Sequence, residues 1–258
     1  MLETAVQAAR TAGQIVMEKY HRPLQVRVKG LRDLVTEADV AAQEAIVSLI
    51  AARFPSHAIL AEENLGSLEE LGEYTWIVDP LDGTTNYAFR LPIFSISIAL
   101  AHRGQPVLGV VYDPTRDHLF HAEAGQGAFL NGASLCVAER EKLIGTLIAF
   151  DWAREPAVRE TLLRILNHVA RQVGTVRALG SAALGPCYVA AGWLDAYFHA
   201  RLSPWDVAAA AVIVREAGGQ AVDFDGRPWA LASPRFLAAS SALYPRISTL
   251  INEGLSAS

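Results

Sequence analysis

Apolar residues recur at helical spacing near the start of the chain, and this pattern predicts two helices. The second is predicted from about residue 36 to 54, where Pro55 ends it. The segment between the two helices, VRVKGLRD (26–33), is basic and contains glycine, so we expect a loop there. The first helix is predicted from the apolar positions Leu2, Val6, Ala9, Gly13, Val16 and Tyr20.

Short apolar runs follow and predict strands. AILAE (58–62) and YTWIVD (74–79) have the character of buried strands, and each ends at an acidic residue. FSISIAL (94–100) alternates apolar and small polar residues, as strands do. VLGVVYD (107–113) and HLFHAE (118–123) are expected to be its hairpin neighbours. The first half is therefore predicted to be two helices and a mostly antiparallel sheet, an α+β arrangement.

In the second half, strand-like and helical segments alternate. This alternation is typical of an α/β unit. We therefore expect an N-terminal α+β subdomain at 1–142 and a C-terminal α/β subdomain at 143–258. The predicted strands are 144–150, a short strand running into 178–181, 195–200, 220–224 and 236–240; the predicted helices are 157–170, a helix to about 191, and 205–219 with Gly218 at its C-cap.

Composition indicates a globular protein with a substantial core. Of 258 residues, 52% are hydrophobic and 19% charged, which argues against disorder. The net charge is −5 and no Lys/Arg block stands out, so nothing points to nucleic acid or to an anionic membrane. The sequence shows no signal-peptide pattern, and Cys136 and Cys187 form no CxxC motif. The expectation is a cytoplasmic protein.

The segment WIVDPLDGTTNY (76–87) carries the strongest chemical signal. An apolar strand delivers Asp79, Pro80 takes the chain out of the sheet, and Asp82 follows three residues after Asp79. Gly83 permits close backbone approach, and two threonines follow where a short helix could start. Such a stretch combines hard oxygen ligands for Mg²⁺ with backbone N–H groups for a phosphate. An isolated D-x-x-D-G stretch is more often a capped turn, but the TTN that follows it and a second strand that ends in acids reverse that preference here.

Three further segments carry acids with both a structural and a functional interpretation. Glu62 and Glu63 follow a strand, so only one of them would face a site, and a solvated loop is the alternative. Thr36 and Asp39 have the spacing of a capping box. Asp206 begins a long apolar helix, where an acid is stabilised by the helix dipole. None of these acids is decisive alone.

Taken together and in this order, the segments resemble the inositol monophosphatase family, and the resemblance covers nearly the whole chain. It implies a layered α-β-α-β-α sandwich, hydrolysis of a small phosphorylated metabolite with two or three Mg²⁺ ions per site, and a homodimer. The matching segments are DLVTEAD (33–39), AEEN (61–64), WIVDPLDGTTNY (76–87), GSAAL (180–184) and SPWDVAAAAVIVREAGG (203–219).

The resemblance also assigns roles to individual residues. The implied metal ligands are Glu62, Asp79, the Leu81 carbonyl, Asp82 and Asp206, with Asp79 bridging two ions. Glu62, Thr84 and Asp39 would activate the nucleophilic water. Lys29 matches the family's mobile metal-binding loop, which is about one residue shorter here. The implied phosphate and substrate contacts are Gly83, Thr84, Gly180, Ser181, Ala182, His199 and Asp206.

Phosphoryl transfer needs an in-line nucleophile and neutralised phosphate oxygens, and metal-activated water meets both needs. Attack by Asp79 itself ranks lower, because a bridging carboxylate has its lone pairs engaged by metal.

Position 199 departs from the family pattern. Inositol-specific members commonly carry Glu where this chain has His199, a weaker acceptor that can become cationic. Together with Arg177 and Arg201, this favours a more anionic or more varied substrate; the alternative is a solvent-facing His at the rim without a selective role. Inositol monophosphate, fructose 1,6-bisphosphate or another phosphosugar, histidinol phosphate and 3′-phosphonucleotides all stay open. So does a regulatory or binding protein that retains the scaffold, although the intact acids count against it.

Overall fold

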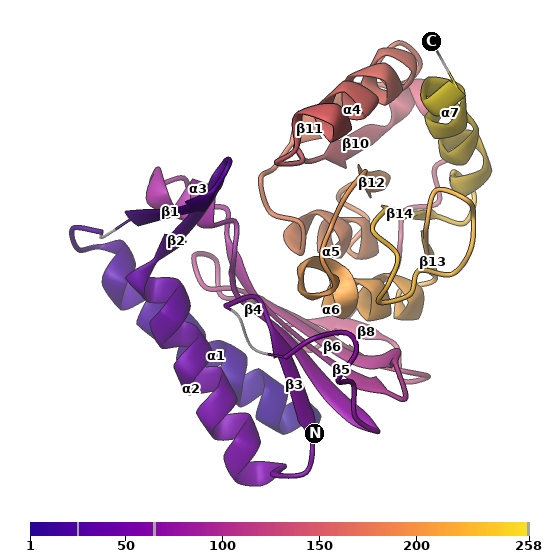
Figure 1. The fold of residues 1–258 in the computed structure, drawn as a ribbon. Coiled ribbons are helices and arrows are strands. Elements are labelled where there is room, and N and C mark those ends of the chain that lie inside the picture. The colour runs from indigo at the N-terminus through magenta and orange to yellow at the C-terminus, as the bar shows by residue number, and fades with distance from the viewer. Residues whose placement is uncertain (25, 64–65, 257–258) are drawn as a thin grey trace.

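Helices and sheets alternate in five layers across the molecule. The computed structural model describes residues 1–24, 26–63 and 66–256 (Figure 1). Two helices cover one face of a first sheet, two more lie between this sheet and a second one, and two cover the outer face of the second sheet. The α-β-α-β-α fold expected from the sequence is thus confirmed. In order, these pairs are α1 (Leu2–Tyr20) with α2 (Glu37–Arg53), α5 (Leu184–Ala190) with α6 (Pro204–Glu216), and α4 (Pro156–Val169) with α7 (Tyr244–Ser256).

The first sheet is mostly antiparallel, as predicted. Within the described residues it has seven strands in chain order, and only the β3–β4 pair is parallel. Its last two strands were not predicted, because they are only three and two residues long. The strands are β3 (Ala58–Ala61), β4 (Tyr74–Asp82), β5 (Ser95–His102), β6 (Gln105–Asp113), β7 (His118–Glu123), β8 (Ala128–Leu130) and β9 (Ala133–Ser134).

The strands of the second sheet alternate with helices along the chain, as predicted, and the sheet mixes parallel and antiparallel pairs. In the described part of the chain its order is β11-β10-β12-β14-β13, with β10 parallel to both of its neighbours. The first of these strands along the chain is shorter than predicted, because Leu143–Gly145 forms a 3₁₀ turn. The strands are β10 (Leu147–Phe150), β11 (Thr175–Ala178), β12 (Ala196–His199), β13 (Gly219–Val222) and β14 (Phe236–Ser240).

Two local predictions were wrong, and one helix was missed. The expected loop at 26–33 is a hairpin of β1 (Val26–Gly30) and β2 (Asp33–Thr36), which alternation of valine with basic residues could have indicated. Helix α7 was not predicted at all. The C-cap of α6 is Ala217, and Gly218 follows it with φ +84°.

The core is continuous between the two sheets. Helix α6 is apolar on all sides, and every residue from Val207 to Val214 is buried. The helix packs closely on β6 at Gly109, where an added Cβ would lie 2.2 Å from the Ala209 carbonyl oxygen. One apolar cluster therefore contains residues on both sides of position 142, and the division into two subdomains stays a prediction. None of the helices described here has both the length and the apolar character needed to cross a bilayer.

Candidate active site

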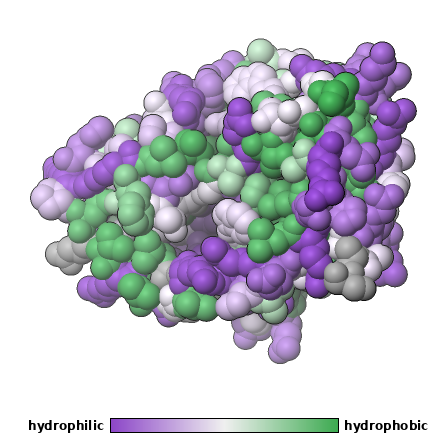
Figure 2. Space-filling view, turned by 90° about the horizontal axis from the view of Figure 1, so that it is seen from above, coloured by the Kyte–Doolittle hydropathy of each residue, from purple (hydrophilic) through white to green (hydrophobic). Residues whose placement is uncertain are grey.

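A cleft of about 850 Å³ opens where the two halves of the molecule meet. Seen from above, the surface is hollowed near its middle, with hydrophilic side chains along the lower edge of the hollow (Figure 2). The lining comes from the end of β4, the start of α3 (Thr84–Ala88), the β10–α4 and β11–α5 connections, and the start of α6. Its size falls in the range of pockets that take small-molecule ligands.

The end of β4 brings Asp79 and Asp82 to the cleft. Contrary to the sequence expectation, Pro80 does not take the chain out of the sheet. Strand β4 continues to Asp82, which pairs with Ser95 of β5, and the register shifts between Asp79 and Asp82, so the strand bulges at Pro80. The Asp79 Oδ1 accepts the Leu81 N–H at 3.0 Å, which fixes the carboxylate over its own turn. Both aspartates are buried, at 2% and 5% exposure, and both line the cleft.

Gly83 and Thr84 make the turn from β4 into α3. Gly83 has φ +85°, and an added Cβ would lie 2.9 Å from the Ile93 carbonyl oxygen. This position therefore needs glycine for both its conformation and its space. The Thr84 hydroxyl lies 3.1 Å from the Asp39 Oδ1 and 3.0 Å from the Leu81 carbonyl oxygen.

Asp39 stands behind the cleft and reaches it through Thr84. It is fully buried and is not part of the lining. Its Oδ2 accepts the N–H of Thr36 at 2.8 Å and the Thr36 hydroxyl at 2.6 Å, so the predicted capping box is confirmed. Because the other oxygen contacts the Thr84 hydroxyl, one carboxylate both caps α2 and orients a hydroxyl of the cleft.

Of the two acids after β3, Glu62 is the one that lines the cleft. Its Oε1 lies 3.7 Å from both the Lys29 Nζ and an Arg154 nitrogen. Glu63 is not part of the lining and instead forms an ion pair with Lys29. Its backbone N–H donates to the Gln43 side chain at 3.0 Å. The sequence argument that only one of these neighbours faces a site agrees with this placement.

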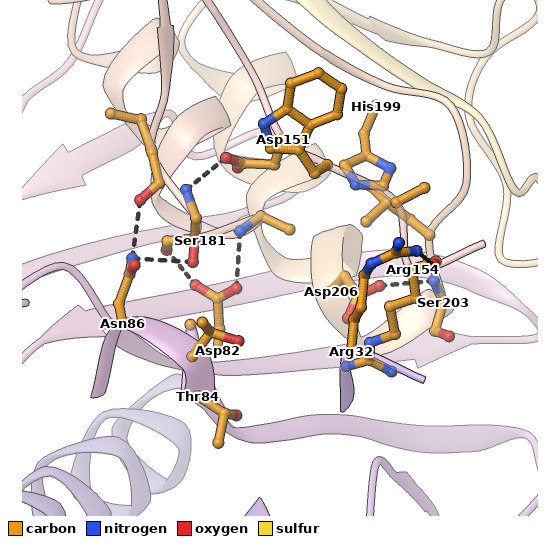
Figure 3. Close-up of a pocket in the computed structure, with 18 of the residues that line it drawn as sticks. Arg32, Asp82, Thr84, Asn86, Asp151, Arg154, Ser181, His199, Ser203 and Asp206 are labelled. Carbon is orange, nitrogen blue, oxygen red and sulfur yellow. Dashed lines mark hydrogen bonds between the residues drawn. The ribbon is translucent and has the colours of Figure 1, made fainter. Parts of the chain in front are cut away.

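The β11–α5 connection holds Asp82 from the other half of the molecule. The Ser181 hydroxyl and the Ala182 N–H both donate to Asp82, the latter at 2.8 Å (Figure 3). Gly180 has φ +74° and precedes these donors. The Ser95 hydroxyl of β5 also donates to Asp82, at 2.9 Å. Two residues predicted as substrate contacts, Ser181 and Ala182, thus also position a predicted metal ligand.

Asp206 enters the cleft from the first turn of α6. Its Oδ2 accepts the Ser203 N–H at 2.7 Å, in a second capping box (Figure 3). The structure therefore brings Glu62, Asp79, Asp82 and Asp206 to one cleft from distant parts of the sequence.

Burial and mutual repulsion raise the pKa values of these acids. Burial is the largest cause for each of them. It raises the pKa of Asp82 to about 6 and, with help from Glu62, that of Asp206 to about 8. The pKa of Asp79 rises well above its ordinary value, through burial and then through Glu62, Asp82 and Asp206. Burial likewise raises the pKa of Asp39 to about 6, against hydrogen bonds from Thr36.

His199 differs from both sequence expectations. It is only 5% exposed, so the ring is not solvent-facing. Burial lowers its pKa to about 4, which keeps the ring neutral at pH 7 and contradicts a cationic role. The Nδ1 accepts the Arg201 N–H at 3.0 Å, and the ring also hydrogen-bonds the backbone of Trp152. His199 lines the cleft, but its ring nitrogens are engaged by backbone.

The donor set fits a hard divalent cation. Carboxylates and a backbone carbonyl are the oxygen ligands that Mg²⁺ prefers. A cation would relieve the repulsion that raises the pKa of Asp79 and Asp206. Among the described residues, no group of three or more His, Cys, Asp or Glu side chains is arranged so that it could hold a metal ion by itself. An open cleft agrees with Mg²⁺, which keeps waters and substrate oxygens among its ligands.

Sequence reasoning missed several cleft residues. Asp151 follows the apolar run of β10 as Asp79 follows that of β4, so the same signal was present. Its oxygens accept the Gly180 N–H and, at 3.1 Å, the Tyr197 hydroxyl. The Asn86 amide donates to the Leu179 carbonyl at 2.8 Å. Arg154 lies in a loop without periodicity, and no sequence pattern marks it.

The chain is similar over nearly its whole length to proteins of one known family. The sequence model of the inositol monophosphatase family matches residues 1–256. Nus factor SuhB of Pasteurella multocida is 40% identical over 260 residues, covering 99% of this chain and 97% of that protein. Inositol monophosphatase 3 of Solanum lycopersicum is 40% identical over 258 residues, covering 98% and 96%. An inositol monophosphatase (IMPase) structure from Thermotoga maritima superposes with a TM-score of 0.91 at 35% identity, covering 98% and 97%.

The family match and the similarity over nearly the full length to these proteins place the chain in a class of phosphatases for which metal dependence is general. Within that class, it belongs to the inositol monophosphatase family.

Proposed function

We propose that this protein hydrolyses a small phosphate monoester with Mg²⁺, using metal-activated water as the nucleophile. The observation that carries the proposal is the convergence of four acids, from three separate segments, on one cleft that Gly83 and Thr84 also line. In the reaction, the water oxygen bonds to phosphorus, the bond from phosphorus to the ester oxygen breaks, and that oxygen takes up a proton. The products are an alcohol and inorganic phosphate.

Glu62, Asp79, the Leu81 carbonyl, Asp82 and Asp206 would hold the metal. When bound, Mg²⁺ would lower the pKa of a water and neutralise phosphate oxygens and the leaving oxygen. All five residues line the cleft. We propose two or three ions, on family resemblance alone.

The chain's own residues would position the water and move its proton. The Thr84 hydroxyl, held by the Leu81 carbonyl and the Asp39 Oδ1, would orient the water. Glu62, whose pKa is raised mainly by burial, would accept a proton from that water. Asp39 would remain ionised or share the proton through Thr84, because its pKa of about 6 lies close to neutral.

The phosphate would lie against the turn at Gly83 and Thr84, where α3 begins and backbone N–H groups are free of helical partners. Gly180, Ser181, Ala182 and His199 would border the organic part of the substrate. All of them line the cleft. Because the His199 nitrogens are engaged by backbone, this residue would shape the pocket rather than accept substrate hydroxyls.

A regulatory role is the alternative, and one comparison favours it. Relatives from Pasteurella multocida and Escherichia coli are named Nus factor SuhB. Binding to transcription machinery would need only the scaffold, whereas this chain retains every acid of the proposed metal site. We therefore rank catalysis first. A cytoplasmic homodimer is proposed from family resemblance alone.

A phosphate-release screen tests the proposed function. The panel contains myo-inositol 1-phosphate, fructose 1,6-bisphosphate, histidinol phosphate and a 3′-phosphonucleotide, each with Mg²⁺ or with EDTA. Asp79→Asn keeps the shape of the side chain but removes a charge, and release should fall below detection. The control is Asp225→Asn, an acid outside the cleft that pairs with Arg235 at 2.9 Å. Near-normal release by Asp79→Asn, or full release in EDTA, contradicts the proposal.

A further inference from the structure

One side of the cleft is rich in arginine. Arg154, Arg159 and Arg201 all line it, and we call these three the arginine wall. They come from the β10–α4 connection, from α4 and from the β12–α6 connection. The chain carries a net charge of −5, so this concentration of positive charge is not a property of the surface as a whole.

Each guanidinium of the wall is oriented by a neighbour. The Arg159 Nε donates to the Ala153 carbonyl at 2.7 Å, and its guanidinium carbon lies 5.4 Å from the centre of the Trp152 ring. The Arg201 Nε lies 2.9 Å from a Glu155 oxygen. Because arginine carries five N–H donors, Arg159 and Arg201 retain donors beyond these contacts.

Arg154 links the wall to the acids. One of its nitrogens lies 3.7 Å from Glu62, and its carbonyl accepts from Arg32 at 2.8 Å. Its side chain is 54% exposed, so water or a ligand reaches it.

The acceptors on this side of the cleft already have partners. Both ring nitrogens of His199 bond to backbone, and both oxygens of Asp151 accept a hydrogen bond. Glu155 pairs with Arg201. The wall therefore offers mainly N–H donors and positive charge. Such a surface favours a group rich in acceptors and negative charge over the hydroxyl groups of a neutral polyol.

Arg154 of the wall lies across the pocket from the place proposed for the reacting phosphate. In Figure 3, Asp82, Thr84 and Asn86 lie to one side of the pocket, and Arg32 and Arg154 lie to the other. A cleft of about 850 Å³ has room for a sugar-sized molecule that spans both sides.

We propose that the arginine wall is a second anion-binding subsite, and that the preferred substrates are phosphate monoesters carrying another phosphate or a carboxylate. Arginine binds both groups through paired N–H donors. The substrate part of this inference rests on the proposed function, since the acids must act on the first phosphate while the wall binds the second anion.

The test compares two substrates that differ only in the second anion, fructose 1-phosphate and fructose 1,6-bisphosphate. The measured quantity is the ratio of kcat/KM for the bisphosphate over the monophosphate, followed by release of the 1-phosphate. We expect a ratio of about 10 or more in the wild type, because one hydrogen bond between the wall and the second anion changes an equilibrium or rate constant by about that factor. In Arg201→Gln and in Arg159→Gln the ratio should fall several-fold towards one.

Arg103→Gln is the matched control. Like Arg201, Arg103 is exposed and pairs with a glutamate, Glu73 at 3.0 Å, but it lies outside the cleft. Its ratio should equal that of the wild type. A wild-type ratio near one, or ratios that move equally in the control and in both wall variants, overturns the inference.

A binding measurement separates failure of the subsite from failure of the proposed function. Calorimetric titration of both sugar phosphates in Ca²⁺, in place of Mg²⁺, reports affinity without relying on turnover. Tighter binding of the bisphosphate, lost in Arg201→Gln, supports the subsite even if neither sugar is hydrolysed, and only the proposed function then fails. Equal affinities for both sugars overturn the subsite even if both are hydrolysed.

Discussion

The acids of the cleft should destabilise the metal-free protein, and Asp206→Asn measures this effect. Asparagine keeps the side-chain oxygen that accepts the Ser203 N–H, so the start of α6 stays capped. The substitution removes only the charge. Because Asp206 is buried near Glu62 and Asp82, its pKa rises from 3.8 to about 8.

The size of the effect follows from this pKa. A folded pKa above the unfolded value means that the folded state binds the proton more tightly. The contribution of protonated Asp206 to the stability of the metal-free wild type is therefore fully present below pH 4, and it is lost as pH rises towards 8. At pH 7 the loss amounts to about 4 kcal/mol, and at pH 5 to about 1.5 kcal/mol, at 1.36 kcal/mol per pH unit. Asp206→Asn should recover these amounts.

The assay is urea unfolding at pH 5 and pH 7, in EDTA and in Mg²⁺. In EDTA the variant should be more stable than the wild type, and more so at pH 7. Mg²⁺ should stabilise the wild type, by about 2.7 kcal/mol at 100 times its dissociation constant, and should stabilise the variant less. Asp225→Asn should change stability by no more than about 0.5 kcal/mol in any buffer. The reasoning fails if Asp206→Asn is no more stable than the wild type in EDTA at pH 7, or if Mg²⁺ stabilises both equally.

Two further substitutions test single positions. His199 has a folded pKa of about 4, below its unfolded value, so its contribution to stability is present above pH 6.5 and is lost as pH falls towards 4. When pH falls from 7 to 5, the wild type should therefore lose about 2 kcal/mol more of its free energy of unfolding in urea than His199→Gln loses. Equal losses in the two proteins would contradict a buried neutral ring. Gly83→Ala places a Cβ 2.9 Å from the Ile93 carbonyl oxygen at φ +85°, whereas Gly104→Ala at φ +77° meets nothing within 4 Å. Urea unfolding should show about 1–2 kcal/mol lost in the second and clearly more in the first, and equal losses would show that space at Gly83 is not limiting.

The sequence was most informative where the pattern that predicts an element lies within one continuous segment. The helical period of α1, the strand before Asp79 and the D-x-x-D-G turn each depend on neighbouring residues, and the structure has an element at each place. Helix α7 was also within reach, since Ile247, Leu250 and Ile251 are buried at helical spacing.

The arginine wall and the surroundings of His199 could not be predicted in this way. Arg154 and Arg201 lie in connections between elements, where no period indicates direction. Their positions depend on partners distant in the sequence: Arg154 contacts Glu62, and Arg201 contacts Glu155. The neutral state of His199 depends on burial, which a single residue type does not reveal. Tertiary packing, rather than local pattern, decides all three.

Two acids show that capping and a role in the site are compatible. From the sequence, Asp39 and Asp206 could each be explained as helix caps. The structure uses one carboxylate oxygen of each for the cap, because Asp39 Oδ2 accepts the Thr36 N–H and Asp206 Oδ2 accepts the Ser203 N–H. In Asp39 the other oxygen contacts the Thr84 hydroxyl.

A carboxylate has two oxygens, so a cap fixes its orientation without exhausting its ability to accept. The cap also restricts the side chain to one rotamer, which lowers the entropy lost when a ligand binds. In this fold the cap at a helix start therefore fixes the orientation of an acid of the site. That an acid caps a helix is no argument against its having a role in the site.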